Sequence, residues 1–282
     1  MVAILISTYN GSKYLKDQLD SLIVQTYNDW IIAIRDDGST DTTQDIIKEY
    51  LCKYPEKIIF YDSSLNLGAG KSFMHLLELT KADYYMFCDQ DDVWMRDKIK
   101  ISVDKIQSLE IEFGKDTPIG IFTDLTVVDS NLNILMPSLW KGDNRHPEYT
   151  KDLYQQWINR HATYGCTMII NNAAKQIVFP YRQFDGVMGA HDAWIEYILI
   201  KKGIYRYIDK PTIYYRQHGT NVIGANMGIT CKDEVKNLME HPIQLIRKLI
   251  KDYRRAKMMP FKISYVKILW YRIYQSVNSL IK

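Results

Sequence analysis

The chain has 282 residues, 46% hydrophobic and 24% charged, the composition of an ordinary soluble globular protein with one large domain or two smaller ones. Its four cysteines form no Cys-x-x-Cys pair, which argues against a zinc site and a disulfide framework and fits a reducing cytoplasm. The net charge is only +3, the apolar start at residues 2–6 is too short for a signal peptide, and no stretch has the length of a transmembrane helix.

The N-terminal part of the chain alternates short apolar runs with amphipathic stretches. Strand and helix are predicted to alternate four times, with the strands at residues 2–7, 30–34, 57–61 and 84–88. Such a repeat predicts an α/β fold with a mostly parallel sheet that helices cover on both faces. Ligands of these sheets bind at the carboxyl ends of the strands, where three polar loops follow, at residues 7–10, 36–41 and 89–92.

The rest of the chain is less regular. It predicts a helix near residues 95–110, a strand at 119–128 and an irregular stretch at 129–160. After a strand at 164–170 and a turn-rich loop, His191 and Asp192 open another helix. Two short strands and a glycine-rich stretch that we expect to be mobile follow at residues 205–208, 212–216 and 217–230.

Three carboxylates, those of Asp89, Asp91 and Asp92, follow the fourth apolar strand within four residues. Crowded carboxylates repel one another and resist ionisation when they are buried. A divalent cation that prefers oxygen ligands, Mg²⁺ or Mn²⁺, relieves this repulsion. The alternative is a solvated acidic turn that caps a helix starting near Met95.

Two further motifs allow both a structural and a chemical interpretation. Asp36-Asp37-Gly38 suits a plain turn, or a carboxylate that accepts the imide N–H of uracil or thymine. His191-Asp192 suits a helix N-cap, or a carboxylate general base within reach of a substrate hydroxyl.

Three cationic or metal-binding side chains carry similar alternatives. Arg216 and His218 either end a strand at the surface or bind a diphosphate, with His218 as a metal ligand. The Gly-Lys-Ser at residues 70–72 lacks the first glycine of a phosphate-binding loop, because Leu65 occupies that position. Lys71 therefore either contacts an anion or lies on a solvated helix face.

The order and spacing of these motifs, from Val2 to about Gly224, resemble those of the family 2 glycosyltransferases, which have a GT-A fold. His-Asp-x-Trp at 191–194 together with Tyr-Arg-Gln-His-Gly at 215–219 is more narrowly similar to the bacterial rhamnosyltransferase branch. The motifs that carry the resemblance also include Ser7-Thr8-Tyr9-Asn10-Gly11, Gln25-Thr26-Tyr27, Asp36-Asp37-Gly38-Ser39-Thr40-Asp41, Asn66-Leu67-Gly68, Asp89-Gln90-Asp91-Asp92-Val93-Trp94 and Gly165-Cys166.

The resemblance implies a role for each matching residue. Asp192 is the catalytic base, although the family's common Glu-Asp is His191-Asp192 here. Asp89 and Asp91 hold Mn²⁺ or Mg²⁺, with His218 as a third ligand. The residues expected to contact the nucleotide sugar are Ser7, Tyr9, Asp37, Asn66, Lys71, Gln90 and Arg216.

The implied activity is an inverting, metal-dependent transfer of a sugar from a nucleotide-sugar donor, and dTDP-L-rhamnose is the favoured donor. The acceptor would be a lipid-linked saccharide. The reaction would be a step in the synthesis of a bacterial surface polysaccharide such as a capsule or cell-wall polymer. One alternative is a UDP-hexose or UDP-N-acetylhexosamine donor, and another is a non-catalytic sugar-nucleotide or carbohydrate-binding module. Residues 1–235 would form the catalytic domain, with residues 217–230 as a mobile lid.

The C-terminal tail, residues 236–282, differs in charge from the rest. It carries eleven Lys or Arg against two acids, whereas the preceding part carries 25 basic and 31 acidic residues. Its basic amphipathic helices predict contact with an anionic membrane surface, at the cytoplasmic face of the plasma membrane. The alternatives are a helical hairpin packed on the catalytic domain and a homodimer interface. Nucleic acid is a poorer partner, because no nucleic-acid motif accompanies the basic excess.

Overall fold

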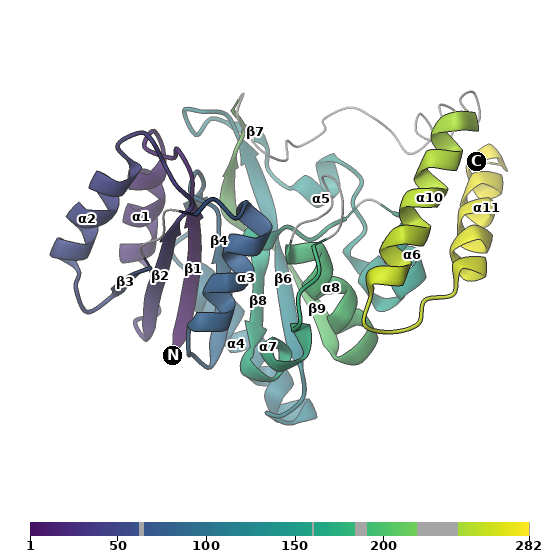
Figure 1. Ribbon diagram of the computed structural model, residues 1–282, viewed down its shortest axis with the longest axis horizontal. Coiled ribbons are helices and arrows are strands. Elements are labelled where there is room, and N and C mark those ends of the chain that lie inside the picture. The colour runs from purple at the N-terminus through teal and green to yellow at the C-terminus, as the bar shows by residue number, and fades with distance from the viewer. Residues whose placement is uncertain (62–64, 160, 184–190, 219–241, 282) are drawn as a thin grey trace.

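A computed structural model of the chain describes all residues except 62–64, 160, 184–190, 219–241 and 282 (Figure 1). Its centre is a sheet of nine strands in the order β3-β2-β1-β4-β8-β6-β9-β5, with β7 paired to β6. The predicted lid falls mostly on residues 219–230, outside the described residues, so it stays a prediction.

The first half of the sheet follows the predicted repeat. Its four strands are parallel: β1 (Val2–Thr8), β2 (Trp30–Asp36), β3 (Ile58–Tyr61) and β4 (Tyr84–Cys88). Successive side chains of a strand face opposite sides, so Ile4 and Ile6 pack in one core and Ala3 and Leu5 in the other. The helices that cover the two faces are α1 (Leu15–Ile23) and α2 (Thr43–Lys53) on the first and α3 (Ala69–Leu79) on the second.

The second half of the sheet is mixed. Strand β8 (Met168–Asn171) runs antiparallel to both of its neighbours, β4 and β6 (Ile119–Val128). Strand β9 (Ile204–Arg216) is parallel to β6, and β5 (Val93–Trp94) is antiparallel to β9. The α/β fold is thus confirmed, but the sheet is mostly parallel only in its first half.

The remaining elements complete the two layers. Strand β7 (Ile134–Met136) pairs antiparallel with the end of β6, and α4 (Lys98–Phe113) covers the same face as α1. On the other face lie α7 (Asn172–Val178) and α8 (His191–Lys202). The stretch predicted to be irregular contains three short helical segments: α5 (Leu139–Gly142), a 3-10 helix (Pro147–Lys151) and α6 (Leu153–Ile158).

Several element boundaries were predicted wrongly. The helix expected from about residue 95 begins at Lys98, because Val93 and Trp94 pair with β9 instead. The two short strands expected at 205–216 are one strand, β9, with register shifts opposite residues 123–126. The strand expected from Tyr164 is preceded by a 3-10 turn, Gly165–Thr167, and starts at Met168.

The tail forms two helices, α10 (Pro242–Met258) and α11 (Tyr265–Ile281), that lie beside α6 (Figure 1). Tyr271 of α11 stacks on Tyr154 of α6 with ring centroids 5.8 Å apart. Arg255 of α10 is buried, donates to the Tyr197 hydroxyl at 2.9 Å and lies 4.9 Å from the Trp157 ring. The hairpin packing that was the alternative for this tail is therefore present, whereas the boundary at residue 235 stays a prediction. No helix among the described residues is long and apolar enough to span a bilayer.

Candidate active site

The loop after β1 is held by a side-chain amide. Gln90 accepts a hydrogen bond from the Tyr9 N–H at 2.8 Å and donates one to the Tyr9 carbonyl at 3.0 Å. A Cβ on Gly11 would lie 2.2 Å from the Gln90 Oε1 atom, so a larger residue there would displace the Gln90 side chain. Gln90, predicted to contact the nucleotide, thus braces this loop and leaves the Tyr9 side chain half exposed at the strand ends.

The carboxylate of Asp36 is buried and well supplied with donors. It accepts hydrogen bonds from Thr8, Ser39 and Gln44. Burial would raise its pKa, but the hydrogen bonds from Ser39, Gln44 and Thr8 hold the pKa of Asp36 below its usual value. Asp36 is therefore a structural anion that joins the ends of β1 and β2.

Asp37 joins the end of β2 to the loop before α3. Its carboxylate accepts a hydrogen bond from the buried Arg35 and others from the N–H groups of Leu67 and Gly68, at 2.7 and 2.8 Å. Arg35 also donates to Ser72 at 2.9 Å, and Ser7 donates to the same hydroxyl at 2.7 Å. Arg35 was not predicted as a site residue, because its charge is visible in the sequence but its burial is not.

Two more of the predicted nucleotide contacts lie along this loop. Asn66 is exposed, and its side-chain oxygen accepts from the Gly68 N–H at 3.2 Å. Lys71 is exposed on the first turn of α3. The structure thus gathers Ser7, Tyr9, Asp37, Asn66 and Lys71 around the ends of β1 and β2.

The carboxylates after β4 are short of donors. Burial, then Asp91 and Asp192, raises the pKa of Asp89 to about 7. Asp92 is fully buried, and burial with its two acidic neighbours raises its pKa well above the usual value. Its Oδ1 accepts from the Arg216 N–H at 3.0 Å, but its Oδ2 has no nitrogen or oxygen partner among the described residues. The interpretation of Asp92 as a cap for the next helix is therefore wrong.

Two side chains beneath this cluster were not assigned a role from sequence. The Cys166 Sγ atom and one oxygen each of Asp89 and Asp92 lie within 4.8 Å of one another. Lys98 is fully buried, with its Nζ 3.4 Å from the Thr212 hydroxyl, and burial lowers its pKa to about 8. A lysine so buried is a partial counter-charge to the acidic cluster, because Asp92 in turn favours its protonated form.

Asp91 has one strong partner. The His218 Nε2 atom lies 2.8 Å from the Asp91 Oδ2 atom, and the His218 ring stacks on Tyr14 with centroids 4.8 Å apart. The predicted ligands Asp91 and His218 are thus brought together across 127 residues. Carboxylate ligands suit Mg²⁺ or Mn²⁺, and Asp89 and Asp92, whose ionisation is held back by burial, gain most from a nearby cation. The donor set therefore fits a divalent ion.

Arg216 lies beside this pair. Its guanidinium donates to Asp17 at 2.9 Å and to the Ser130 carbonyl at 3.0 Å, and it lies 4.5 Å from the Tyr14 ring centroid. The side chain is buried against these groups. Its predicted contact with a diphosphate is untested, and Asp17 and Tyr14 are neighbours that the sequence did not indicate.

Asp192 lies at the start of α8, facing the acidic cluster. Its carboxylate accepts from the N–H groups of Gly165 at 3.2 Å and Ala193 at 2.7 Å, which orient it. Its charge is among the causes of the raised pKa of Asp89, so the two carboxylates are neighbours. The base candidate and the metal-ligand candidates therefore converge at one edge of the sheet.

His191, which stands where the family commonly has Glu, is a packing residue. It is buried, with its ring 4.4 Å from the Phe73 ring and 4.8 Å from the Phe87 ring. Burial lowers its pKa to about 4, against the influence of Asp192. A Cβ on Gly165 would lie 2.7 Å from the His191 Nε2 atom. A neutral imidazole thus fills the space beside Asp192, without adding a second charge.

The fold and the site define a GT-A-like α/β protein with an acidic centre at the ends of its strands. Residues 3–178 match the profile of the family "Glycosyl transferase family 2", and the chain belongs to that family. It is therefore a glycosyltransferase. The chain is 33% identical to the dTDP-rhamnosyl transferase RfbG of Shigella flexneri over 241 residues, which cover 80% of this chain and 76% of that protein.

Other relatives agree with this assignment. The chain is 26% identical over 258 residues to an uncharacterized glycosyltransferase of Nostoc, covering 89% of this chain and 75% of that one. S. aureus TarS 1–349 in complex with UDP-GlcNAc is similar in structure, with a TM-score of 0.55, 18% identity, and coverage of 91% and 70%. The mannosyltransferase PcManGT of Pyrobaculum calidifontis, in complex with GDP-Man and Mn²⁺, has a TM-score of 0.54, 14% identity, and coverage of 87% and 64%. These two likenesses show the fold.

Proposed function

We propose that the chain is an inverting, metal-dependent glycosyltransferase that moves a sugar from a nucleotide-sugar donor to a saccharide acceptor. The favoured donor is dTDP-L-rhamnose. The observation that carries the proposal is the convergence of Asp89, the Asp91–His218 pair and Asp192 at one edge of the sheet. The similarity to a dTDP-rhamnosyl transferase supports the choice of donor.

In this proposal the chain's own residues bind, orient and take up a proton. Tyr9 and Asp37 hold the nucleoside at the ends of β1 and β2. Asp89, Asp91 and His218 would hold a divalent ion, which would supply positive charge to offset the charge on the leaving diphosphate. Asp192, oriented by two backbone N–H groups, accepts the proton of the acceptor hydroxyl as that oxygen attacks the anomeric carbon. A single displacement from the face opposite the leaving group inverts this centre.

The sequence also allowed two alternatives to this function, and each predicts a different experimental result. A UDP-hexose or UDP-N-acetylhexosamine donor uses the same residues, and TarS has been seen with UDP-GlcNAc. A non-catalytic module that binds a sugar nucleotide or carbohydrate would need neither Asp91 nor Asp192, and both are present. A panel of sugar nucleotides, each measured for hydrolysis and thermal stabilisation with Mn²⁺ and with chelator, separates these possibilities.

The expected result of this panel is metal-dependent hydrolysis with dTDP-L-rhamnose above the UDP sugars. A larger rate with a UDP sugar would show that the UDP sugar, and not dTDP-L-rhamnose, is the donor. Binding without any hydrolysis or transfer would favour the non-catalytic module. Full turnover in chelator would show that the transfer requires no metal ion.

We further propose that the tail attaches the protein to the cytoplasmic face of an anionic membrane, where a lipid-linked acceptor for surface polysaccharide is found. Apolar side chains of both tail helices are exposed, among them Trp270, which is 57% exposed. Exposed basic residues of the same helices surround them, a combination that suits a lipid interface. The exposed apolar residues are Ile246, Ile250, Tyr253, Val266, Trp270, Ile273 and Tyr274, and the exposed basic residues include Arg247, Lys251, Lys257 and Lys267.

Vesicle flotation tests this attachment on the full chain. Trp270→Ser combined with Tyr274→Ser should lower recovery with phosphatidylglycerol vesicles, whereas Ile111→Ser, which changes an exposed residue of α4, should not. Equal recovery of the three proteins would refute the proposal. If light scattering shows that the double variant converts a dimer to a monomer and vesicle recovery is unchanged, the tail face is a homodimer interface.

A further inference from the structure

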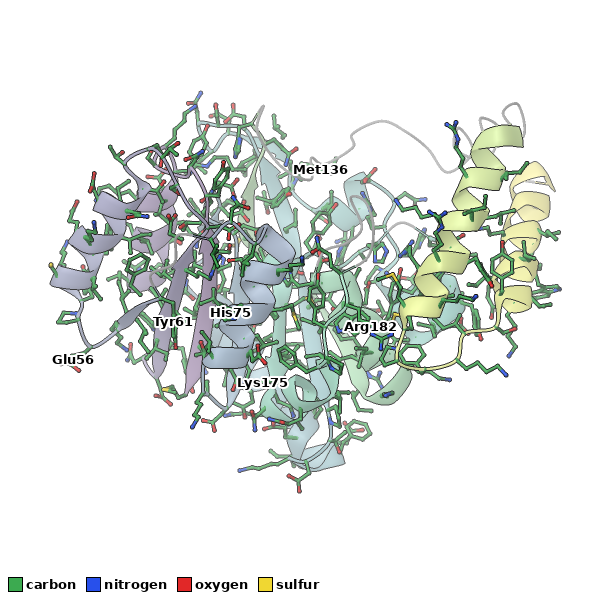
Figure 2. The ribbon with its side chains drawn as sticks, viewed as in Figure 1. Glu56, Tyr61, His75, Met136, Lys175 and Arg182 are labelled. Atoms are coloured by element: carbon green, nitrogen blue, oxygen red, sulfur yellow. The ribbon has the colours of Figure 1, made fainter. Side chains whose placement is uncertain are left out.

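A groove runs along the outer side of α3. It is a cavity of about 590 Å³ between α3 and the segment 179–183 that follows α7. One wall carries Leu67, Lys71, His75 and Glu78, and the other carries Phe179 and Tyr181. Figure 2 shows His75 on α3, with Lys175 of α7 below it and Arg182 to its right. This groove is not part of the acidic centre described above.

One end of the groove reaches the candidate active site. The Leu67 N–H donates to Asp37, so this end adjoins the residues that gather at the ends of β1 and β2. Lys71, His75 and Glu78 are four and three residues apart, which places them on one face of α3. Because a helix rises 1.5 Å per residue, this wall extends about 10 Å down the flank of the molecule.

The other wall is attached to the helix that carries Asp192. The Tyr181 ring meets the Trp194 ring edge-on at 5.8 Å, and the Trp194 indole N–H donates to the Val178 carbonyl at 2.6 Å. Burial, and after it the charge of Asp192, raises the pKa of Tyr181, so its hydroxyl lies within the field of the base candidate. This wall of the groove is thus joined to α8, the helix that Asp192 opens.

The chemistry of the walls suits a saccharide. Aromatic rings and a few polar groups in a cavity of this size are typical of small-molecule sites. The rings of Phe179 and Tyr181 offer flat apolar surfaces to the C–H faces of a pyranose, and Tyr181 has a polar tip as well. His75, Glu78 and Gln183 are exposed and offer hydrogen-bond partners for sugar hydroxyls.

The position of the groove favours the acceptor over other occupants. A donor held by Asp37 and the acidic cluster stays at the strand ends, whereas this wall continues to the third turn of α3. A lipid chain is a poor occupant, because Lys71, His75 and Glu78 are exposed polar residues at the mouth. The exposed apolar residues of the tail lie on α10 and α11, away from α3 (Figure 1).

We propose that the groove between α3 and residues 179–183 binds the acceptor saccharide, namely the sugars that precede the one whose hydroxyl attacks the donor. This inference rests on the proposed function. It predicts that the protein distinguishes acceptors by length, since only an acceptor with several sugars reaches His75 and Glu78.

A steric block tests the groove. His75→Trp adds bulk at an exposed lining position, and Leu79→Trp adds the same bulk at an exposed position of α3 outside the lining. The probes are N-acetylglucosamine and rhamnose glycosides of one, two and three sugars on one aglycone. His75→Trp should raise KM for the trisaccharide about tenfold, an effect of roughly 1.4 kcal/mol, while monosaccharide transfer stays within about twofold. Leu79→Trp should behave as the unmodified protein.

A milder variant covers the case in which tryptophan disturbs the helix. Glu78→Gln keeps the size of the side chain and should raise KM for the trisaccharide, but not for the monosaccharide. If both groove variants leave the trisaccharide KM unchanged, or change all three lengths equally, the inference is wrong.

Donor measurements separate this inference from the proposed function. Calorimetry with dTDP-L-rhamnose and Mn²⁺, and donor hydrolysis without acceptor, do not involve His75 and should be the same in His75→Trp and the unmodified protein. If no sugar nucleotide is bound or hydrolysed by any of these proteins, the proposed function fails. If donor hydrolysis persists and transfer is insensitive to the groove variants, only the groove inference fails.

Discussion

The carboxylates that follow β2 and those that follow β4 end strands on either side of β1, yet their surroundings are opposite. Asp36 and Asp37 receive hydrogen bonds from hydroxyl, amide and guanidinium donors, and these hold the pKa of Asp36 low. Asp89 and Asp92 lie among other acids, with Lys98 as a buried counter-charge, and their pKa values are raised.

The difference concerns which charges the folded chain neutralises by itself. At β2 the protein supplies the donors, so this part of the site is rigid before any ligand arrives. At β4 the described residues supply few donors to Asp89 and Asp92, so a proton or a cation would relieve the repulsion within the cluster. In the proposed function, the nucleoside end of the donor site would therefore be preformed, and its diphosphate end would be completed on binding.

The largest expected effect is that of Asp192→Asn. Loss of the base should lower transfer by about 10²–10⁴-fold, the contribution of general-base catalysis, and leave binding of dTDP-L-rhamnose with Mn²⁺ largely intact. A transfer assay and titration calorimetry measure the two quantities. Asp116→Asn, which removes an exposed carboxylate near the amino ends of β1 and β4, at the edge of the sheet opposite to Asp192, is the control. Near-normal turnover of Asp192→Asn would show that Asp192 is not the catalytic base.

The next effect tests whether the cluster after β4 is completed by a metal. His218→Ala removes the partner of Asp91 and should raise the Mn²⁺ concentration for half-maximal activity about tenfold or more. His146→Ala changes a histidine on the irregular stretch and should leave the Mn²⁺ dependence unchanged. An identical Mn²⁺ titration for His218→Ala would exclude His218 as a ligand.

A pair of substitutions addresses the comparison directly. Asp36→Asn replaces an acceptor by a donor among hydrogen-bond donors and should lower the free energy of unfolding by about 1–3 kcal/mol. Asp92→Asn removes a carboxyl group whose ionisation is disfavoured by burial and by its acidic neighbours, and should raise the stability of the metal-free protein by roughly 1 kcal/mol. Denaturant unfolding with chelator measures both. Changes of the same sign would show that the two clusters do not differ in the way described.

The smallest effect is a pH dependence at the nucleoside end. Hydrogen bonds from Thr43 and Ser12 outweigh burial and hold the pKa of Asp41 at about 2. A lowered pKa in the folded state contributes stability above the unfolded-state pKa near 4, and this contribution is lost as the pH falls toward 2. Thermal unfolding between these pH values should show a loss that Asp41→Asn reduces. A curve of unchanged slope would contradict this attribution.

Much of the site was predictable because its parts are local. Short apolar runs between amphipathic stretches predicted four parallel strands, and polar loops after these strands predicted that Ser7, Asp37 and Asp91 lie at the same edge of the sheet. The position of β8 between β4 and β6, antiparallel to both, was not predictable. An apolar run in the sequence indicates a strand, but not the direction in which that strand runs relative to its neighbours in the sheet. The buried roles of Arg35 and Lys98 were missed for a related reason, since charged side chains are usually exposed.

The sequence by itself determined the class of the protein, because the spacing of short motifs at strand ends survives without knowledge of the contacts between distant segments. It also determined the charge and the amphipathic pattern of the tail. Only the tertiary structure decided that Asp92 is a buried acid and not a helix cap, that His191 is a neutral packing residue, and that the tail packs on α6. These outcomes depend on which segments, far apart in the chain, exclude water from one another, and no local pattern carries that information.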